Sequence, residues 1–304
     1  MLCAKCNSIL RRYGKTPDGL QKYKCAYCLK YFQESRNKLF DSMHLSDKKC
    51  VQVLHSLIEG MSVRSTERIT GIHRDTILDI LVFAGNKCEK LLEEKLQAIP
   101  VSDVQADEMW GFVYCKEKRK RIFYPNNEAV GHAWTYVAIE RNSRLVLAWH
   151  LGKRSAEDTS IFAAKLRRAT SGHFQLSTDG FKSYPDSIRA HFGNSIDFGQ
   201  LVKTFSRGAN PILKITKTPQ IGTPFLKRIS TSHVERHNLT MRMSIRRLTR
   251  LTNAYSKKWE NLRAALAFYF AYYNFCRIHS TIRCTPAMAS SITNSSWPIE
   301  KLLC

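Results

Sequence analysis

The chain has 304 residues, of which 43% are hydrophobic and 11% aromatic, enough to bury a sizeable core and more than one domain. This composition excludes a chain that is disordered as a whole. Lysine and arginine total 48 against 25 acidic residues, which gives a formal charge of +23. Such an excess favours nucleic acid as a partner, because basic side chains neutralise phosphates. A basic protein on an anionic lipid surface is the alternative.

The sequence lacks the apolar segments of a membrane protein. No apolar run approaches the roughly 20 residues that a membrane-spanning helix needs. The first residues include cysteines and arginines where a signal peptide would have an apolar core. We therefore expect a cytoplasmic protein that associates with the nucleoid through DNA.

Two C-x-x-C pairs occur near the N-terminus, Cys3 with Cys6 and Cys25 with Cys28, separated by eighteen residues. Four thiolates at this spacing bind Zn²⁺ tetrahedrally, so residues 1–40 are predicted to form a zinc ribbon that is folded by its structural metal. Two disulfides are the alternative. A thioredoxin-like redox site would need a βαβ context that is absent here. The other six cysteines are scattered, which is typical of reduced thiols.

Residues 45–86 have the spacing of a helix-turn-helix domain. One helix is followed by a second at 63–69, a glycine turn and a third helix that begins near Arg74. The start of the third helix would present Arg74, Asp75 and Thr76 to the major groove of DNA. Small helical bundles without a DNA function share this spacing, but the basic charge of the chain favours DNA binding.

The remainder is predicted to form a mixed sheet flanked by helices. Residues 87–100 are expected to form a charged linker helix, residues 101–285 the main domain and residues 286–304 a C-terminal tail. The expected strands lie at 101–109, 134–140, 145–152, 174–178 and 201–205, and the expected helices at 156–169 and 185–192. This order is that of a ribonuclease H-like core. The fold class is therefore multidomain α+β: zinc ribbon, helix-turn-helix, and a ribonuclease H-like mixed α/β core with a helical C-terminal region.

Two basic segments receive simpler predictions. Residues 205–229 are expected to be irregular, and residues 116–121 to form a solvated loop. The aromatic residues of 259–275 recur at helical spacing and are predicted to be helix core. His233, His237 and His279 are expected to form hydrogen bonds or contact phosphate, because magnesium prefers oxygen ligands.

Three carboxylates lie where the predicted elements would bring them together. Asp107 ends the first strand of the core, Asp179 ends the fourth, and Glu235 lies near the start of the last helical region. Their mutual repulsion would raise the pKa of at least one of them unless cations are present. Two Mg²⁺ or Mn²⁺ ions would supply those cations. Asp103 and Glu108 are alternative ligands: Asp103 shares a strand face with Asp107, whereas Glu108 points to the other.

Glu235 is the only acidic residue among eleven lysines and arginines between Lys203 and Arg250. On one helix, Arg242 and Arg246 would share its stripe, seven and eleven residues further along. Such a stripe suits a metal ion held against a phosphodiester, with arginine binding the phosphate oxygens. A structural ion pair between Glu235 and one of these arginines is the alternative.

Three motifs resemble the catalytic blocks of the DDE transposases of bacterial insertion sequences, and in particular the first-numbered insertion-sequence family. The motifs are Asp107-Glu108-Met109-Trp110, Thr178-Asp179-Gly180-Phe181-Lys182-Ser183-Tyr184 and Val234-Glu235-Arg236-His237-Asn238-Leu239-Thr240-Met241-Arg242. The resemblance covers nearly the whole chain, including the zinc ribbon and helix-turn-helix that this family places before its core. It implies that Asp107, Asp179 and Glu235 are metal ligands and that Arg242 is the basic residue two helical turns after the glutamate.

The resemblance implies a transposase that binds the terminal inverted repeats of its element, cleaves their ends and joins the 3′-hydroxyls to target DNA. Its partners would be double-stranded DNA and a second copy of the chain, as a dimer on paired ends. Lys227, Arg228 and Arg246 would contact the DNA backbone. The alternatives are a non-catalytic DNA-binding regulator derived from such an element, and another ribonuclease H-like nuclease such as a resolvase.

Overall fold

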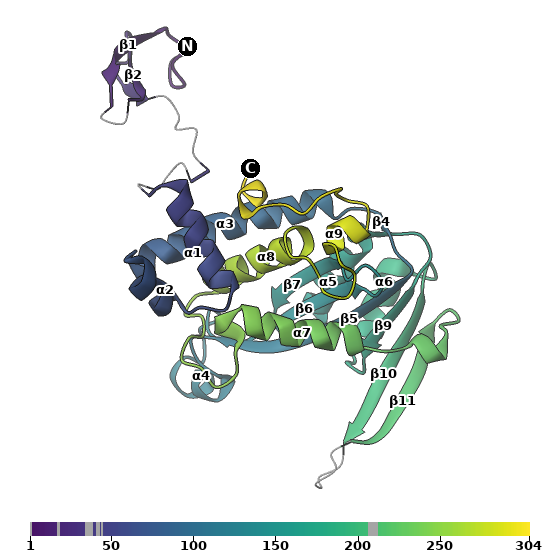
Figure 1. Ribbon diagram of the computed structural model, residues 1–304. Helices are drawn as coiled ribbons and strands as arrows, with labels where there is room; N and C mark the ends of the chain where they lie inside the picture. Colours follow the sequence, from purple (N-terminus) through teal and green to yellow (C-terminus); the bar gives the residue numbers. More distant parts are fainter. Residues whose placement is uncertain (1, 17–18, 34–38, 41–42, 44, 206–211) are drawn as a thin grey trace. The chain divides into compact units, whose positions relative to one another are not determined.

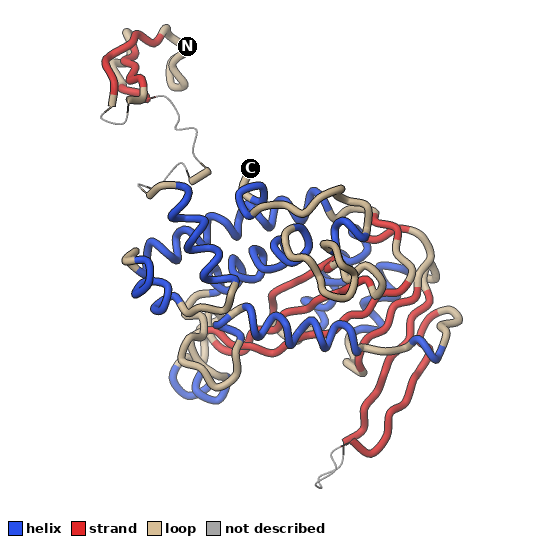
Figure 2. The backbone as a smooth tube through the Cα atoms, in the orientation of Figure 1, coloured by secondary structure: helices blue, strands red, loops and turns tan. Residues whose placement is uncertain are grey.

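The computed structural model divides the chain into two compact units, Met1–Cys50 and Val51–Cys304 (Figure 1, Figure 2). It describes residues 2–16, 19–33, 39–40, 43, 45–205 and 212–304. Among these residues, no helix combines the length and the apolar character that crossing a bilayer requires.

The first unit contains a small antiparallel sheet. Its strands are β1 (Leu10–Lys15), β2 (Gln21–Cys25) and β3 (Tyr31–Gln33), in the order β1-β2-β3. Among the described residues of 2–33, only Cys3 and Cys25 are buried. A sheet with so little apolar core needs another source of stability. The expected ribbon at 1–40 also includes residues 17–18 and 34–38, which lie outside the described residues.

Three helices follow, and they lie where the sequence predicted them. They are α1 (Asp47–Ile58), α2 (Val63–Thr70) and α3 (Arg74–Lys95). Ser62 caps α2 by accepting the Ser65 N–H (3.0 Å), and Gly71 ends it with φ 69°, a left-handed conformation that suits glycine. This places a short turn between α2 and α3.

Helix α3 is longer than expected and packs against the region that contains the main sheet. It runs without a break through residues 86 and 87, where a boundary between a DNA-binding domain and a linker helix was expected. Its partner is α8 (Trp259–Phe275), and Gly85 permits the close approach: a Cβ there would lie 2.4 Å from Cα of Ala264. Helix α3 therefore belongs to the same compact unit as the sheet.

The described residues of the second unit form a six-stranded sheet in the order β11-β10-β9-β5-β6-β7. The strands are β5 (Asp103–Val113), β6 (Gly131–Glu140), β7 (Val146–Gly152), β9 (Gln175–Asp179), β10 (Asp197–Phe205) and β11 (Ile212–Ile221). β5, β6 and β7 are an antiparallel meander, and β9 and β10 run parallel to β5. A short parallel pair, β4 (Ile99–Pro100) with β8 (Thr170–Ser171), lies outside this sheet. The meander followed by parallel strands agrees with the predicted element order.

Helices cover both faces of this sheet (Figure 1). α5 (Ala156–Ala169) lies on one face, where its Phe162 ring contacts Tyr136 of β6 (5.5 Å). α8 lies on the other face, where its Phe270 ring contacts Trp149 of β7 (5.4 Å). The remaining helices of the core are α6 (Tyr184–Phe192), α7 (Ser232–Ser244) and α9 (Pro286–Ala289). Most of the aromatic residues of α8 are buried, which confirms their prediction as core.

Three predictions of secondary structure were wrong. β11 lies within 205–229, where no strand was predicted; it is an edge strand stabilised by pairing with β10, and its many exposed polar residues conceal it in the sequence. α4 (Glu117–Phe123) replaces the expected loop at 116–121. β5 extends to Val113 because it pairs with β6 along its whole length, so Asp107 lies in the middle of the strand.

Candidate active site

An acidic cluster lies at the centre of the sheet. Asp107, Glu108 and Asp179 each provide a carboxylate oxygen, and these oxygens lie within 4.8 Å of one another. β9 ends at Asp179 while its neighbour β5 continues, and Ala106 is paired with Thr178 immediately before the two aspartates. The end of one parallel strand beside the middle of another therefore brings Asp107 and Asp179 together.

The cluster has the electrostatics of a cation site. Burial, followed by the neighbouring charges of Asp179 and Glu108, raises the pKa of Asp107 to about 7. Burial also raises the pKa of Asp179 and that of Glu108. The expected repulsion between carboxylates is thus present. Because closely spaced oxygen ligands with unfavourable negative charge are what a hard divalent cation stabilises, the cluster fits Mg²⁺ or Mn²⁺.

Glu108 is the most constrained of the three carboxylates. As the strand period predicted, it leaves β5 on the face opposite to Asp107, and there its Oε2 accepts a hydrogen bond from the Tyr184 hydroxyl (3.0 Å). Its Oε1 accepts from Nε of Arg154 (2.8 Å) and lies 2.6 Å from Nη2 of the same guanidinium. Glu108 is therefore neutralised within the protein.

Arg154 is a site residue that sequence reasoning missed. Its guanidinium lies between two aromatic rings, 4.8 Å from the centroid of Trp134 and 4.3 Å from that of Phe181. It also lies 3.6 Å from Oδ2 of Asp179, so it contacts two of the three carboxylates. Arg154 precedes the N-cap of α5 and belongs to none of the motifs, so only the packing reveals its role.

Glu235 lies beside the cluster. Its Oε1 accepts hydrogen bonds from Nζ of Lys203 (2.7 Å) on β10 and from the Thr231 hydroxyl (2.7 Å). Burial opposes ionisation, but these two bonds lower the pKa of Glu235 below its usual value. Its charge nevertheless contributes to the raised pKa of Asp107. The structure therefore brings Asp107 and Asp179 together with Glu108, and holds Glu235 nearby through a lysine.

Helix α7, which carries Glu235, is fixed to β5 by two side chains. The Gln105 carboxamide oxygen accepts the N–H groups of His233 (2.8 Å) and Val234 (3.3 Å), which are unpaired donors of the first helical turn. One turn after the glutamate, Nδ2 of Asn238 donates to Oδ2 of Asp107 (2.9 Å). Sequence reasoning assigned no role to Gln105 or Asn238, although both lie within the neighbourhoods of the motifs.

The two arginines expected on the Glu235 stripe are placed differently. α7 ends two residues before Arg246, so the prediction that Arg246 continues the stripe was wrong. A short 3₁₀ helix, Arg246–Leu248, follows instead. The Arg242 guanidinium donates to the carbonyls of Leu248 (2.8 Å) and Trp110 (3.0 Å). Arg242 thus ties the segment after α7 to β5, and the observed cationic partner of the glutamate is a lysine.

Asp103, one of the two alternative ligands, lies outside the cluster. Its carboxylate is buried and accepts a hydrogen bond from Nη1 of Arg141 (3.1 Å). It is four residues before Asp107, about 13 Å along an extended strand. Glu108, not Asp103, is therefore the flanking carboxylate that joins the cluster.

The candidate DNA contacts lie on exposed surfaces of the second unit. Arg74 and Asp75 are exposed in the first turn of α3, and Thr76 is partly buried. Lys227 and Arg228 are exposed in a short 3₁₀ helix, Leu226–Arg228. These side chains are accessible to a macromolecular partner.

A second group of candidate metal ligands lies in the first unit. Sγ atoms of Cys3, Cys6, Cys25 and Cys28 lie within 4.8 Å of one another, and all four thiols are free. The Cys3–Cys28 and Cys6–Cys25 sulfur distances are 3.6 and 3.4 Å, far from the ~2.05 Å of a disulfide. Tetrahedral Zn²⁺ with Zn–S bonds of about 2.3 Å places sulfurs about 3.8 Å apart. The arrangement therefore fits zinc.

Comparisons with known proteins find similarity only at the level of structure. No family model and no curated protein matches the sequence. The piggyBac transposase synaptic complex with hairpin DNA is similar with a TM-score of 0.41 and 8% identity, over 88% of this chain and 71% of that one. A pre-cleavage Mos1 transpososome is similar with a TM-score of 0.30 and 11% identity, over 83% and 74%. Both TM-scores are below 0.5, so the function is inferred from the site alone.

Proposed function

We propose that this chain is a DDE transposase with a ribonuclease H-like core, which cleaves the ends of its element and joins the 3′-hydroxyls to target DNA. The observation that carries the proposal is the meeting of Asp107 and Asp179 on adjacent parallel strands, with their oxygens within 4.8 Å, in a chain of charge +23. A cation site on a basic protein is suited to a phosphodiester substrate.

Asp107 and Asp179 would hold the metal, and Glu235 would complete the ligand set. Glu108 is the weaker candidate because Arg154 and a tyrosine hydroxyl already neutralise it. Glu235 is more available: its side chain is 46% exposed, and its partner Lys203 is itself a surface side chain at 31% exposure. When bound, Mg²⁺ or Mn²⁺ would supply the positive charge that activates a water or a 3′-hydroxyl and stabilises the leaving oxygen.

The residues of the chain would prepare the site for that chemistry. Arg154 pairs with Glu108 and lies near Asp179, so its positive charge would offset part of the negative charge of the cluster. Gln105 and Asn238 fix the distance between α7 and β5, which sets where Glu235 can lie relative to Asp107. Lys203 would hold Glu235 near the cluster. Phosphoryl transfer would be in line, without a covalent protein intermediate.

DNA binding would be divided among three regions. Arg74, Asp75 and Thr76 at the start of α3 would contact bases in the terminal inverted repeats, while Lys227, Arg228 and Arg246 would contact the phosphate backbone.

The N-terminal sheet would be a zinc ribbon, with Zn²⁺ bound by Cys3, Cys6, Cys25 and Cys28. A dimer would hold two element ends, and target DNA would be the second substrate.

The test is an assay of cleavage and joining. Labelled duplexes that carry the inverted repeats flanking the gene are incubated with the full chain, a target plasmid and Mg²⁺ or Mn²⁺. We expect nicked ends and joined products from the wild type, and neither from Asp107→Asn or Asp179→Asn, although both variants still bind DNA. The matched control is Asp186→Asn, an exposed aspartate in the first turn of α6, which should behave as wild type.

The outcomes separate the proposal from its alternatives. Joining at the wild-type rate by Asp107→Asn would exclude the DDE assignment. Repeat binding without any cleavage by the wild type would indicate a regulator, and cleavage of branched DNA without joining would indicate a resolvase-like nuclease.

A further inference from the structure

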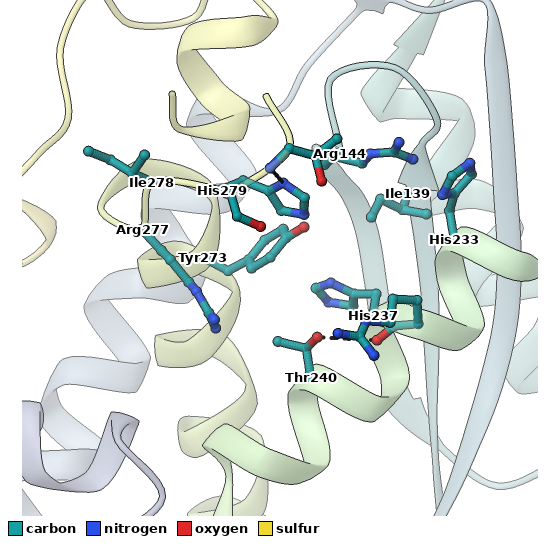
Figure 3. Close-up of a pocket in the computed structure, with 12 residues that line it drawn as sticks. Ile139, Arg144, His233, His237, Thr240, Tyr273, Arg277, Ile278 and His279 are labelled. Carbon is teal, nitrogen blue, oxygen red and sulfur yellow. Dashed lines mark hydrogen bonds between the residues drawn. The ribbon is translucent and has the colours of Figure 1, made fainter. Parts of the chain in front are cut away.

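A second polar site lies on the side of α7 that faces away from the acidic cluster. It is a cavity of about 370 Å³, bounded by the turn between β6 and β7, by α7, and by the end of α8 with the segment that follows it (Figure 3). Three arginines and three histidines are among the twelve residues that line it, and none of the twelve is acidic. They are Arg144, Arg236, Arg277, His233, His237 and His279.

His237 marks the cavity as a place for a hydrogen-bonding ligand. The residue is 3% exposed, and neither of its ring nitrogens has a hydrogen-bond partner among the described residues. Its ring packs against Tyr273 at 4.5 Å and near Tyr269 at 5.7 Å, which fixes the plane of the imidazole. Since buried polar groups are nearly always paired, a group absent from the chain is expected to satisfy His237.

His279 offers a donor to the same space. The Thr281 N–H donates to Nδ1 of His279 (3.2 Å), as the dashed line in Figure 3 shows. A nitrogen that accepts cannot carry the proton of the neutral ring, so the proton lies on Nε2. The His279 ring therefore presents an N–H donor.

The three arginines are uncompensated. Within the part of the chain that the structure describes, no ion pair joins Arg144, Arg236 or Arg277 to a carboxylate. Nη1 of Arg144 is buried without a hydrogen-bond partner among those residues. Three guanidiniums around one cavity without an acid repel one another, and a multivalent anion would relieve this repulsion.

Helix period explains how one helix serves two sites. His233, His237 and Thr240 are spaced i, i+4 and i+7 and line the cavity, while Glu235 and Asn238 occupy the other side of α7. Positions 233 and 235 are about 200° apart around the helix axis. The basic cavity and the acidic cluster are therefore two separate sites that share one rigid element.

We propose that this cavity binds a nucleotide phosphate group, with Arg144, Arg236 and Arg277 on the phosphate oxygens and His237 and His279 as hydrogen-bond partners. Guanidinium forks match phosphate geometry, whereas a neutral ligand would leave the arginines unbalanced. A volume of about 370 Å³ exceeds a lone phosphate and admits part of the attached nucleoside. The phosphate can come from a DNA end or from a free nucleotide. The DNA source rests on the proposed function; the phosphate site does not.

The experiment measures phosphate binding by titration calorimetry on the full chain. The probes are inorganic phosphate, deoxyadenosine monophosphate, and a short duplex with either a 5′-phosphate or a 5′-hydroxyl. We expect saturable binding of both small phosphates, and at least tenfold tighter binding of the phosphorylated duplex than of the hydroxyl duplex. Tight binding of the small phosphates without a preference for the phosphorylated duplex would assign the site to free nucleotides and reject the DNA source.

Variants test whether binding occurs in this cavity. Arg277→Gln and His237→Phe should each weaken binding of inorganic phosphate at least tenfold; phenylalanine keeps the aromatic packing but removes both ring nitrogens. The control is Arg283→Gln, an exposed arginine of the same C-terminal segment that does not line the cavity, which should bind as wild type.

A further variant separates this inference from the proposed enzyme. Asp107→Asn should retain full phosphate binding, since its carboxylate lies in the other site. If no probe binds to wild-type protein, or if Arg277→Gln and Arg283→Gln bind phosphate equally, the cavity is not a phosphate site, whatever the outcome of the joining assay.

Discussion

The two groups of candidate metal ligands differ in what surrounds them. The four thiols belong to a small unit in which, among the described residues of 2–33, only two cysteines are buried. The carboxylates of Asp107 and Asp179 project from β5 and β9, whose other residues are largely buried between helices. A metal bound by the first group would therefore contribute to folding, whereas a metal bound by the second would contribute to the proposed chemistry.

Loss of zinc should have the largest effect. Cys25→Ser removes one of four ligands, and the apparent zinc binding energy of such sites is about 10–16 kcal/mol, most of which is folding energy. We expect the sheet of β1, β2 and β3 to unfold while Val51–Cys304 melts as in the wild type. Mass spectrometry measures the zinc content, and limited proteolysis of the full chain shows which unit has unfolded. Cys304→Ser, an exposed cysteine outside the group, is the control; stoichiometric zinc in Cys25→Ser would refute the site.

At the carboxylates, Glu235→Gln should leave folding nearly unchanged and abolish most of the joining activity. The ion pair with Lys203 is partly exposed, so its loss should cost less than about 1 kcal/mol of folding stability. Joining of a pre-cut end should fall at least a hundredfold, because glutamine lacks the charge that binds a hard cation. Thermal melts and the joining assay separate the two effects.

Lys203→Met provides the matched control for Glu235→Gln, because it breaks the same ion pair and leaves the carboxylate. If the pair is only structural, both variants should change stability and joining alike. If Glu235 binds metal, only the glutamate variant should lose joining to this extent.

Specificity and affinity for DNA should separate by residue. Arg74→Ala is expected to cost about 1–3 kcal/mol on the element's own ends and to relax discrimination, because α3 would present it to base edges. Lys227→Ala should weaken all DNA equally and reduce the salt slope by about one. Competition binding at several salt concentrations measures both. If Arg74→Ala left the ratio of binding to the element's ends and to random-sequence DNA unchanged, Arg74 would not contact bases.

The pH dependence of stability should follow the ionisation of Asp107. Burial raises the pKa of Asp107 to about 7, so the folded state binds this proton more tightly than the unfolded chain does. Its contribution is present below about pH 4 and is lost as pH rises to about 7. With Mg²⁺ the trend should reverse near pH 7, because the ion binds the carboxylate. Melting curves with chelator and with Mg²⁺ test this, and Asp107→Asn should flatten both.

Local features of the sequence were sufficient for most of the elements and for part of the site. Three features depend only on neighbours in sequence: the C-x-x-C spacing, the helical periods of α1, α2 and α3, and the strand that ends at Asp179. The structure places all three as expected. Asp107 and Asp179 were identifiable because the ribonuclease H-like element order places each of them on a core strand, and because their motifs resemble those of the DDE transposases. β11 was not, since an exposed edge strand shows no apolar face and exists through its partner β10.

Tertiary packing decided how the site is completed. Arg154 lies 46 residues from Glu108, and Asn238 lies 131 residues from Asp107, yet each pair forms a hydrogen bond. No period or spacing encodes such contacts, because they depend on where the start of α5 and the face of α7 dock against the sheet. For the same reason the predicted stripe of Glu235, Arg242 and Arg246 does not form: α7 ends before Arg246, and the course of β10 pairs Glu235 with Lys203. The sequence therefore identified candidate site residues, whereas the tertiary fold decided which side chains each of them contacts.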